Sequence, residues 1–288
     1  MTRETTLSSV PDLRRLYATA AFHRGNDHET LPDERVALSG ISVDLKDLTD
    51  YSRLCGFSLT GILPLTYPHL LGFPLQMAVM AGDGFPLPLL GAVHVENVIT
   101  VHRPLRFEDH LDVVVRAQNL RPHRRGRQVD LVTEVSVDDE LAWQGVSTYL
   151  ARGAEHPTAP TSQTPPLDGL EPLTGVPAGP VWRLGGNTGW AYAAVSGDWN
   201  PIHVHALTAR PLGFASAIAH GMFTYARAVA TLAPRVPDAD VISRVWFRKP
   251  VRLPSTVRLR SVVAPGRTLS RLESASAQVE HAVVEQVW

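Results

Sequence analysis

The two halves of this chain repeat each other on either side of a proline-rich segment, and this repeat constrains the fold most. Residues 154–180 carry seven prolines in 27 positions without hydrophobic periodicity, which is typical of an extended linker. On either side of it, the run HRPLRF at 102–107 matches RKPVRL at 248–253, an offset of 146 residues. We therefore predict two related domains, 1–153 and 181–288, joined by a linker over 154–180.

Each half combines strand patterns with one central helix pattern. A helix is expected over 67–81, where Pro74 should break it, and another over 215–232, with Gly221 interpreted as opening the central helix. This mixture predicts the α+β class. The strand candidates are runs of β-branched or alternating apolar residues at 98–101, 111–115, 129–137, 141–149, 245–247 and 257–263.

Composition excludes several classes of protein. The chain has 288 residues, 44% of them hydrophobic, and a formal net charge of −1, so nothing in its charge favours nucleic acid or an anionic membrane. Its one cysteine, Cys55, excludes an internal disulfide and fits a reducing cytoplasm. The N-terminus lacks the apolar core of a signal peptide. The apolar run 62–81 contains three prolines, so we expect a buried core element and no membrane anchor.

An acid and an imidazole stand five residues apart in the run SGDWNPIH at 196–203. Asn200 and Pro201 are turn formers that bend the backbone between Asp198 and His203, and such a pair can share a water for proton transfer near neutral pH. The same run could be only a turn in which Asp198 bonds its own backbone. His203 and His205 could also be read as a metal pair, but no further ligand stands at a standard spacing, so we expect no metal.

This run resembles the hydratase-2 motif of the MaoC-like (R)-specific enoyl-CoA hydratases and 3-hydroxyacyl-thioester dehydratases. Tyr192 precedes it, and the second landmark of that family, Ala219-His220-Gly221-Met222, follows at the usual distance. The resemblance implies a double hotdog, in which two curved antiparallel sheets are each wrapped around a central helix. It also implies reversible hydration of trans-2-enoyl thioesters to (R)-3-hydroxyacyl thioesters in fatty-acid or related lipid metabolism. The substrate itself would carry coenzyme A or the phosphopantetheine of an acyl carrier protein, and no other cofactor is needed.

The resemblance assigns roles to four residues. Asp198 and His203 would hold the water, one removing its proton and the other supplying the proton for C2, with the order left open. Asn200 would help to order the site, or serve the turn alone. The Gly221 N–H, at the positive end of a helix, would bind the thioester oxygen as charge builds on it; simple helix–sheet packing is the alternative. His220 is interpreted as a structural histidine and not as a second base.

Two groups of basic residues are candidates for the phosphates of the thioester carrier. One group is Arg244, Arg248 and Lys249, with Arg252 nearby, and these are our predicted substrate-binding residues. The other lies within 121–127, where a solvated hairpin turn is the simpler interpretation. The sequence does not choose between the two groups.

The first half lacks the acid and the imidazole. It reads GFSLTG at 56–61, and the second half holds about ten more residues in this region by the repeat alignment. We therefore expect one active site per chain, in the second half, and a first half that shapes the acyl pocket around its interrupted helix or simply fills its own core. The two halves would form a pseudo-dimer, and pairing of whole chains stays open. The alternative functions are a hotdog acyl-thioesterase and a non-catalytic acyl-thioester-binding subunit of a dehydratase complex.

Overall fold

The computed structural model describes residues 3–20, 29–82, 84–89, 91–153, 156–160, 179–233 and 239–288. The chain divides into two compact units. Unit 1 comprises Met1–Leu48 and Thr60–Gln163, and unit 2 comprises Thr49–Leu59 and Thr164–Trp288. Unit 2 thus includes an eleven-residue segment that the repeat alignment places in the first half. Most of the predicted linker 154–180 lies outside the described residues, so its extended course stays a prediction.

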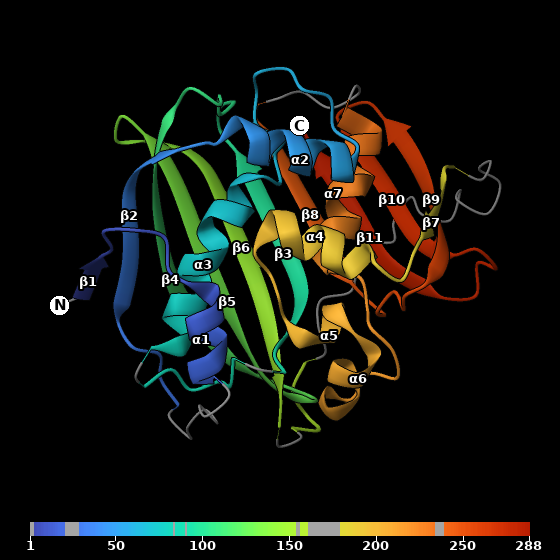
Figure 1. Cartoon of the computed structure of the whole chain (residues 1–288), viewed down its shortest axis with the longest axis horizontal. Coiled ribbons are helices and arrows are strands. Elements are labelled where there is room, and N and C mark those ends of the chain that lie inside the picture. The colour runs from blue at the N-terminus through green and yellow to red at the C-terminus, as the bar shows by residue number, and fades with distance from the viewer. Residues whose placement is uncertain are drawn as a thin grey trace. The chain divides into compact units, whose positions relative to one another are not determined.

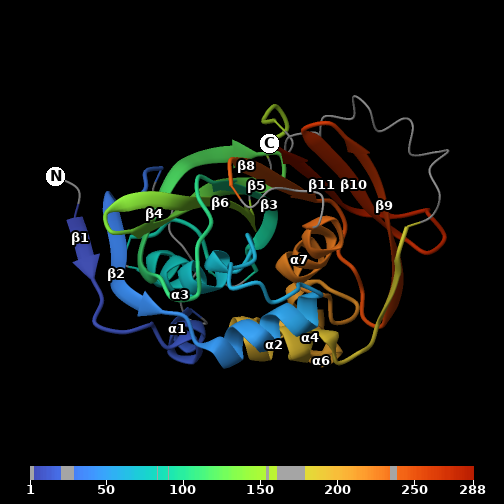
Figure 2. The same ribbon diagram turned by 90° about the horizontal axis from the view of Figure 1, so that it is seen from above.

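Unit 1 is a sheet in which neighbouring strands follow the order β1-β2-β4-β5-β6-β3. All neighbours are antiparallel except β1 and β2, which run parallel. Figure 2 shows β4, β5 and β6 curving around helix α3. The elements are β1 (Arg3–Thr6), α1 (Leu13–Ala20), β2 (Glu34–Ser42), α2 (Leu45–Cys55), α3 (Pro68–Ala81), β3 (Val93–Val101), β4 (His110–His123), β5 (Gly126–Val137) and β6 (Glu140–Arg152), with α2 entering unit 2 at Thr49.

Helix α3 is continuous through Pro74, so the predicted break is wrong. A proline removes one backbone donor from a helix, but ten of the fourteen α3 residues are buried, and packing against the sheet supports the turn around it. The centre of the helix is also polar. Gln76 donates to Thr133 Oγ1 (3.0 Å) and Ser147 Oγ (3.3 Å) and accepts from the Tyr149 hydroxyl (3.0 Å). These bonds tie α3 to β5 and β6.

Unit 2 has neighbouring strands in the order β8-β11-β10-β9-β7, all antiparallel. Its central helix α7 buries eight of twelve residues and lies against β10 and β11 (Figure 1). The elements are β7 (Val181–Leu184), α4 (Thr188–Ser196), α5 (Pro201–Val204), α6 (Ala206–Ala209), η2 (Arg210–Leu212), α7 (Gly221–Leu232), β8 (Val241–Phe247), β9 (Ser255–Ala264), β10 (Arg267–Ser274) and β11 (Glu280–Val287).

The predicted strands are all present, and most are longer than their apolar runs. The predicted turn within 121–127 is the hairpin between β4 and β5. Helix α7 begins at Gly221 as expected, whereas residues 215–220 are not helical. There, the Ala219 N–H donates to the Val251 carbonyl (2.9 Å) and Ile218 forms a β-bridge with Arg252. Within the described residues, no helix is long and apolar enough to cross a membrane.

Candidate active site

Asp198 and His203 lie on the long connection between α4 and α7. This connection spans 197–220 and contains α5, α6 and η2, whereas the corresponding connection of the first half, 56–67, contains no helix. The extra residues expected from the repeat alignment therefore form the short helices that carry His203. They lie within unit 2.

Local hydrogen bonds fix Asp198 at the end of α4. Gly197 ends the helix in the left-handed conformation (φ 72°), which glycine adopts without strain. The Ser196 hydroxyl donates to the Tyr192 carbonyl (2.8 Å) and accepts from the Asp198 N–H (3.2 Å). One Asp198 carboxylate oxygen accepts from the Asn200 N–H (3.1 Å). About a fifth of the Asp198 side chain remains exposed, so the carboxylate can meet a small molecule.

Asn200 begins the helix that carries His203. Its side-chain oxygen accepts from the Ile202 N–H (3.3 Å), and Pro201 occupies the first helical position, which is the usual way to start a helix. Asn200 therefore acts in the structure as the residue that ends the turn and caps α5, in agreement with the turn interpretation. Its role in ordering the site stays a prediction.

His203 is buried and has a defined tautomer. Its Nδ1 lies 2.8 Å from the Ile218 carbonyl oxygen, which can only accept, so Nδ1 carries the hydrogen and Nε2 keeps a free lone pair. Burial lowers the pKa of His203 below its usual value, against the opposing effects of Asp198 and of the bond to Ile218. The imidazole is therefore neutral near pH 7 and has a basic nitrogen to offer.

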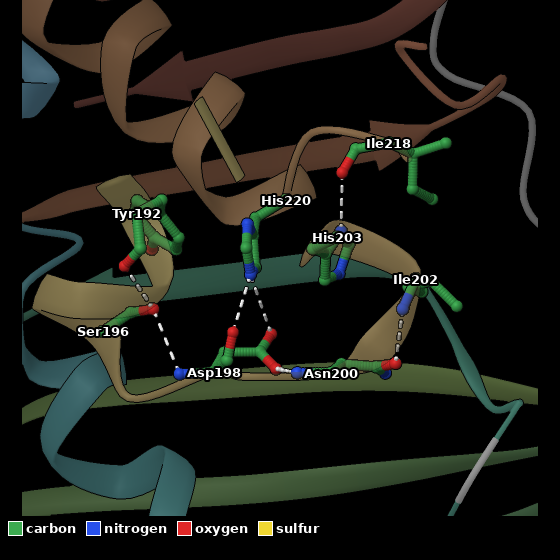
Figure 3. Close-up of polar contacts among 8 residues, drawn as sticks. All are labelled: Tyr192, Ser196, Asp198, Asn200, Ile202, His203, Ile218 and His220. Carbon is green, nitrogen blue, oxygen red and sulfur yellow. Dashed lines mark hydrogen bonds and ion pairs between the residues drawn. The ribbon is translucent and has the colours of Figure 1, made fainter. Parts of the chain in front are cut away.

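His220 joins this pair, which the sequence analysis did not expect. Its ring stacks on that of His203 with centroids 3.7 Å apart, and its Nε2 lies 2.9 Å from the Asp198 carbonyl oxygen (Figure 3). One ligand atom each from Asp198, His203 and His220 falls within a 4.8 Å cluster. The signal was present in the sequence, since His220 directly precedes the glycine that opens α7.

Each histidine of the cluster uses one ring nitrogen for a backbone carbonyl, and the absence of a metal stays a prediction. In each histidine one nitrogen donates to a carbonyl, which leaves His203 Nε2 and His220 Nδ1 for a metal. The two rings are stacked, 26° from parallel. His205, which the sequence paired with His203 as a possible metal ligand, is exposed. It caps α6, where its Nδ1 accepts from the Leu207 N–H (3.1 Å).

Gly221 is the first residue of α7, and its N–H has no intrahelical acceptor. The His220 side chain does not cap this helix, whose N-terminus is the positive end of the dipole. The glycine also serves packing, because a Cβ added there would lie 2.9 Å from the Phe247 ring. The packing interpretation of Gly221 thus has a contact in the structure, and its binding of the thioester oxygen stays a prediction.

Of the predicted phosphate-binding residues, Arg244 lies within β8, and Arg248 and Lys249 directly follow its end. Arg248 and Lys249 are exposed, and their backbone N–H groups donate to the His281 carbonyl (2.8 and 3.3 Å). The Arg244 guanidinium lies 4.7 Å from the centre of the Trp246 ring. Arg248 directly follows Phe247, the ring close to Gly221, and its Nε lies 3.6 Å from a Glu280 carboxylate oxygen. Within the rival group, Arg121 pairs with Asp130 (2.9 Å).

Comparison with known proteins agrees with the geometry. A model of the MaoC like domain matches residues 183–285. The 3-hydroxyacyl-thioester dehydratase X of Mycobacterium tuberculosis is 41% identical over 231 residues, which are 80% of this chain and 81% of that protein. The chain belongs to the MaoC-like dehydratase family. The crystal structure of the mycobacterial relative, HtdX, superimposes with a TM-score of 0.76 at 36% identity, covering 88% of this chain and 98% of that one.

More distant MaoC-like relatives share the fold. A dehydratase from Phytophthora capsici matches 88% of this chain and 94% of its own with a TM-score of 0.70 at 18% identity. An acyl-ACP thioesterase from Bacteroides thetaiotaomicron also matches, covering 88% of this chain and 97% of its own, at TM-score 0.52 and 9% identity. The predicted double-hotdog fold is confirmed. Because a thioesterase shares it, the choice of reaction depends on the side chains of the site.

Proposed function

We propose that the chain is a hydro-lyase that interconverts trans-2-enoyl and (R)-3-hydroxyacyl thioesters in fatty-acid metabolism. The observation that carries the proposal is the convergence of Asp198 and His203 at the N-terminus of α7 in a MaoC-like fold. One ligand atom each of Asp198, His203 and His220 lies within 4.8 Å of the others, which is close enough for a small molecule such as water to contact more than one of them. The (R) configuration is taken from the family.

His203 is the group suited to take a proton from that water. Its Nε2 has the free lone pair, and burial lowers its pKa so that it is unprotonated at neutral pH. As the water oxygen attacks C3, one water proton passes to Nε2. The electron pair of the C2–C3 double bond then moves toward C2 and the thioester carbonyl.

Asp198 supports the charge that this step creates. Its carboxylate raises the pKa of His203 against the effect of burial, so it favours the imidazolium once formed. The pair then delivers the proton to C2, which returns His203 to its neutral form and completes the addition of one water. The Gly221 N–H stabilises the oxygen of the enolate-like intermediate. Dehydration follows the same steps in reverse.

The thioester carrier gives the remaining contacts. Arg248, Lys249 and Arg244 are proposed to meet its phosphates, whether on coenzyme A or on an acyl carrier protein, and the first half is proposed to shape the space for the acyl chain. A cytoplasmic location, from the single cysteine, stays a prediction. So do the lack of nucleic-acid partners and the possible pairing of chains into a homodimer.

The test is hydration of crotonyl-CoA and of a longer enoyl-CoA, followed by loss of the conjugated enoyl absorbance. Asp198→Asn and His203→Ala should each lower kcat by roughly 10²–10⁴-fold. His205→Ala is the matched control, because it removes an exposed imidazole two residues away and should leave kcat within a few fold. Release of free coenzyme A would indicate a thioesterase, and acyl-CoA binding without turnover would indicate a binding subunit; either outcome rejects the hydro-lyase.

A further inference from the structure

His220 contacts Asp198 and His203 and directly precedes Gly221, but it has no role in the proposed proton transfer. Its Nε2 donates to the Asp198 carbonyl oxygen at 2.9 Å and lies 3.7 Å from a carboxylate oxygen of the same residue. Its ring stacks on His203 (Figure 3), and its own peptide continues into Gly221. One side chain therefore links the acid, the base and the start of α7.

The bond to Asp198 holds a short, partly buried stretch of backbone. Asp198 follows the left-handed Gly197, outside any helix. A carbonyl oxygen can only accept, so His220 Nε2 must carry a hydrogen. A shift of the Asp198 backbone would carry its carboxylate with it, and this bond opposes such a shift.

The environment keeps His220 from acting as an acid or a base itself. Burial, followed by the proximity of His203, lowers the pKa of His220 to about 3. Its other nitrogen, Nδ1, is buried without a hydrogen-bond partner in the described part of the chain. The ring also packs on Tyr192, with centroids 4.8 Å apart, so it is held in place by both stacking and the single hydrogen bond.

We propose that His220 is a positioning residue, whose Nε2–H holds the Asp198 backbone so that the carboxylate and His203 meet one water. The inference rests on the proposed hydro-lyase function. It predicts that the hydrogen-bond donor of residue 220 matters more for turnover than its ring. A purely structural histidine, which fills space in the core, predicts the opposite order.

Two substitutions separate these roles. His220→Phe keeps a ring on His203 and Tyr192 but has no donor, whereas His220→Gln loses the ring and keeps an N–H that can reach the Asp198 carbonyl. We expect kcat to fall roughly 10–100-fold in His220→Phe with KM within about threefold, since small displacements of catalytic groups have effects of this size. His220→Gln should recover most of the loss even if its thermal unfolding temperature is the lower of the two.

Each outcome of the experiment is decisive. Wild-type kcat in His220→Phe, or a His220→Gln variant no faster than His220→Phe, would overturn the positioning role. So would an unchanged kcat with a raised KM, because that pattern describes substrate binding. Wild-type enzyme is assayed beside them with the same enoyl-CoA. If it does not hydrate the substrate, the proposed function fails and not this inference alone.

Discussion

Gly189 is the position where one added methyl group should disable the site without touching a catalytic side chain. It is the second residue of α4, and a Cβ built on it would collide with the His203 backbone carbonyl oxygen. Neither atom is the end of a flexible side chain, so α4 and α5 must separate by about 1 Å to accommodate Gly189→Ala. Displacements of this size at a catalytic site can lower turnover about 100-fold.

The cost in stability is smaller than the cost in turnover. Overpacking a tight contact costs about 1–3 kcal/mol, and replacing glycine by alanine in a helix returns up to about 1 kcal/mol. Gly189→Ala should therefore lose about 0–2 kcal/mol in urea unfolding, and it should remain folded at 25 °C. The kcat of enoyl-CoA hydration, measured on the same preparation, should fall about 100-fold.

Gly186→Ala is the matched control for this prediction. It lies three residues earlier in the same unit, and nothing stands within 4 Å of its added Cβ. It should keep both kcat and unfolding free energy close to wild type. If Gly189→Ala also kept wild-type turnover, the close approach of α4 to α5 would have no bearing on the placement of His203, and the geometry argued here would be refuted.

Three further predictions concern the same site. The pKa of His220 is about 3 in the folded protein and about 6.5 in the unfolded chain, so the unfolded chain binds more protons between these pH values. The free energy of unfolding should therefore fall as the pH drops below 6.5, by about 2 kcal/mol at pH 5 from this residue. Urea unfolding of His220→Gln should show a smaller fall over the same pH range. Gly221→Ala should lower kcat, and kcat of this variant and of the double variant with Phe247→Leu separates two causes. If the clash of the added Cβ with Phe247 is the whole cause, the double variant should recover kcat. If the Gly221 amide must approach the thioester oxygen, the double variant should stay slow. Asn200→Ala should remove the N-cap of α5 and destabilise the protein by about 1 kcal/mol, whereas Asn200→Ser should retain most of the cap, as measured by thermal unfolding.

Much of the second unit could be predicted from sequence because its determinants are local. Gly221 marks the start of α7, and Asn200 and Pro201, expected only as turn formers, begin α5. Alternating apolar runs predicted the strands for the same reason. The predicted break at Pro74 was wrong because tertiary packing outweighs the local effect of proline. The helix around Pro74 is buried against a sheet, and this burial compensates for one lost backbone hydrogen bond.

The placement of His220 depends on long-range structure and could not be derived from its neighbours. It needs the extended segment before α7 to pair with Val251 and Arg252, thirty or so residues further along. The same holds for Tyr51, whose ring lies 6.4 Å from that of Tyr192 in unit 2 although the residue belongs to the first half of the sequence. Spacing within a motif identifies the residues of such a site, but not which of them touch.

The insertion in the second half explains why one unit has the proposed chemistry. Helices α5 and α6 lie between α4 and the segment before α7, so that His203 can donate to the Ile218 carbonyl while His220 reaches back to Asp198. The first half has no helix in its shorter connection, and the centre of α3 is tied to its sheet by a buried polar network around Gln76. A second active site there would need both an acid–imidazole pair and a segment long enough to carry it. In a chain whose own site is inactivated by Asp198→Asn and His203→Ala, placing an Asp and a His at the same spacing within 56–61 should therefore restore no activity, because these residues would lack the backbone that makes them meet.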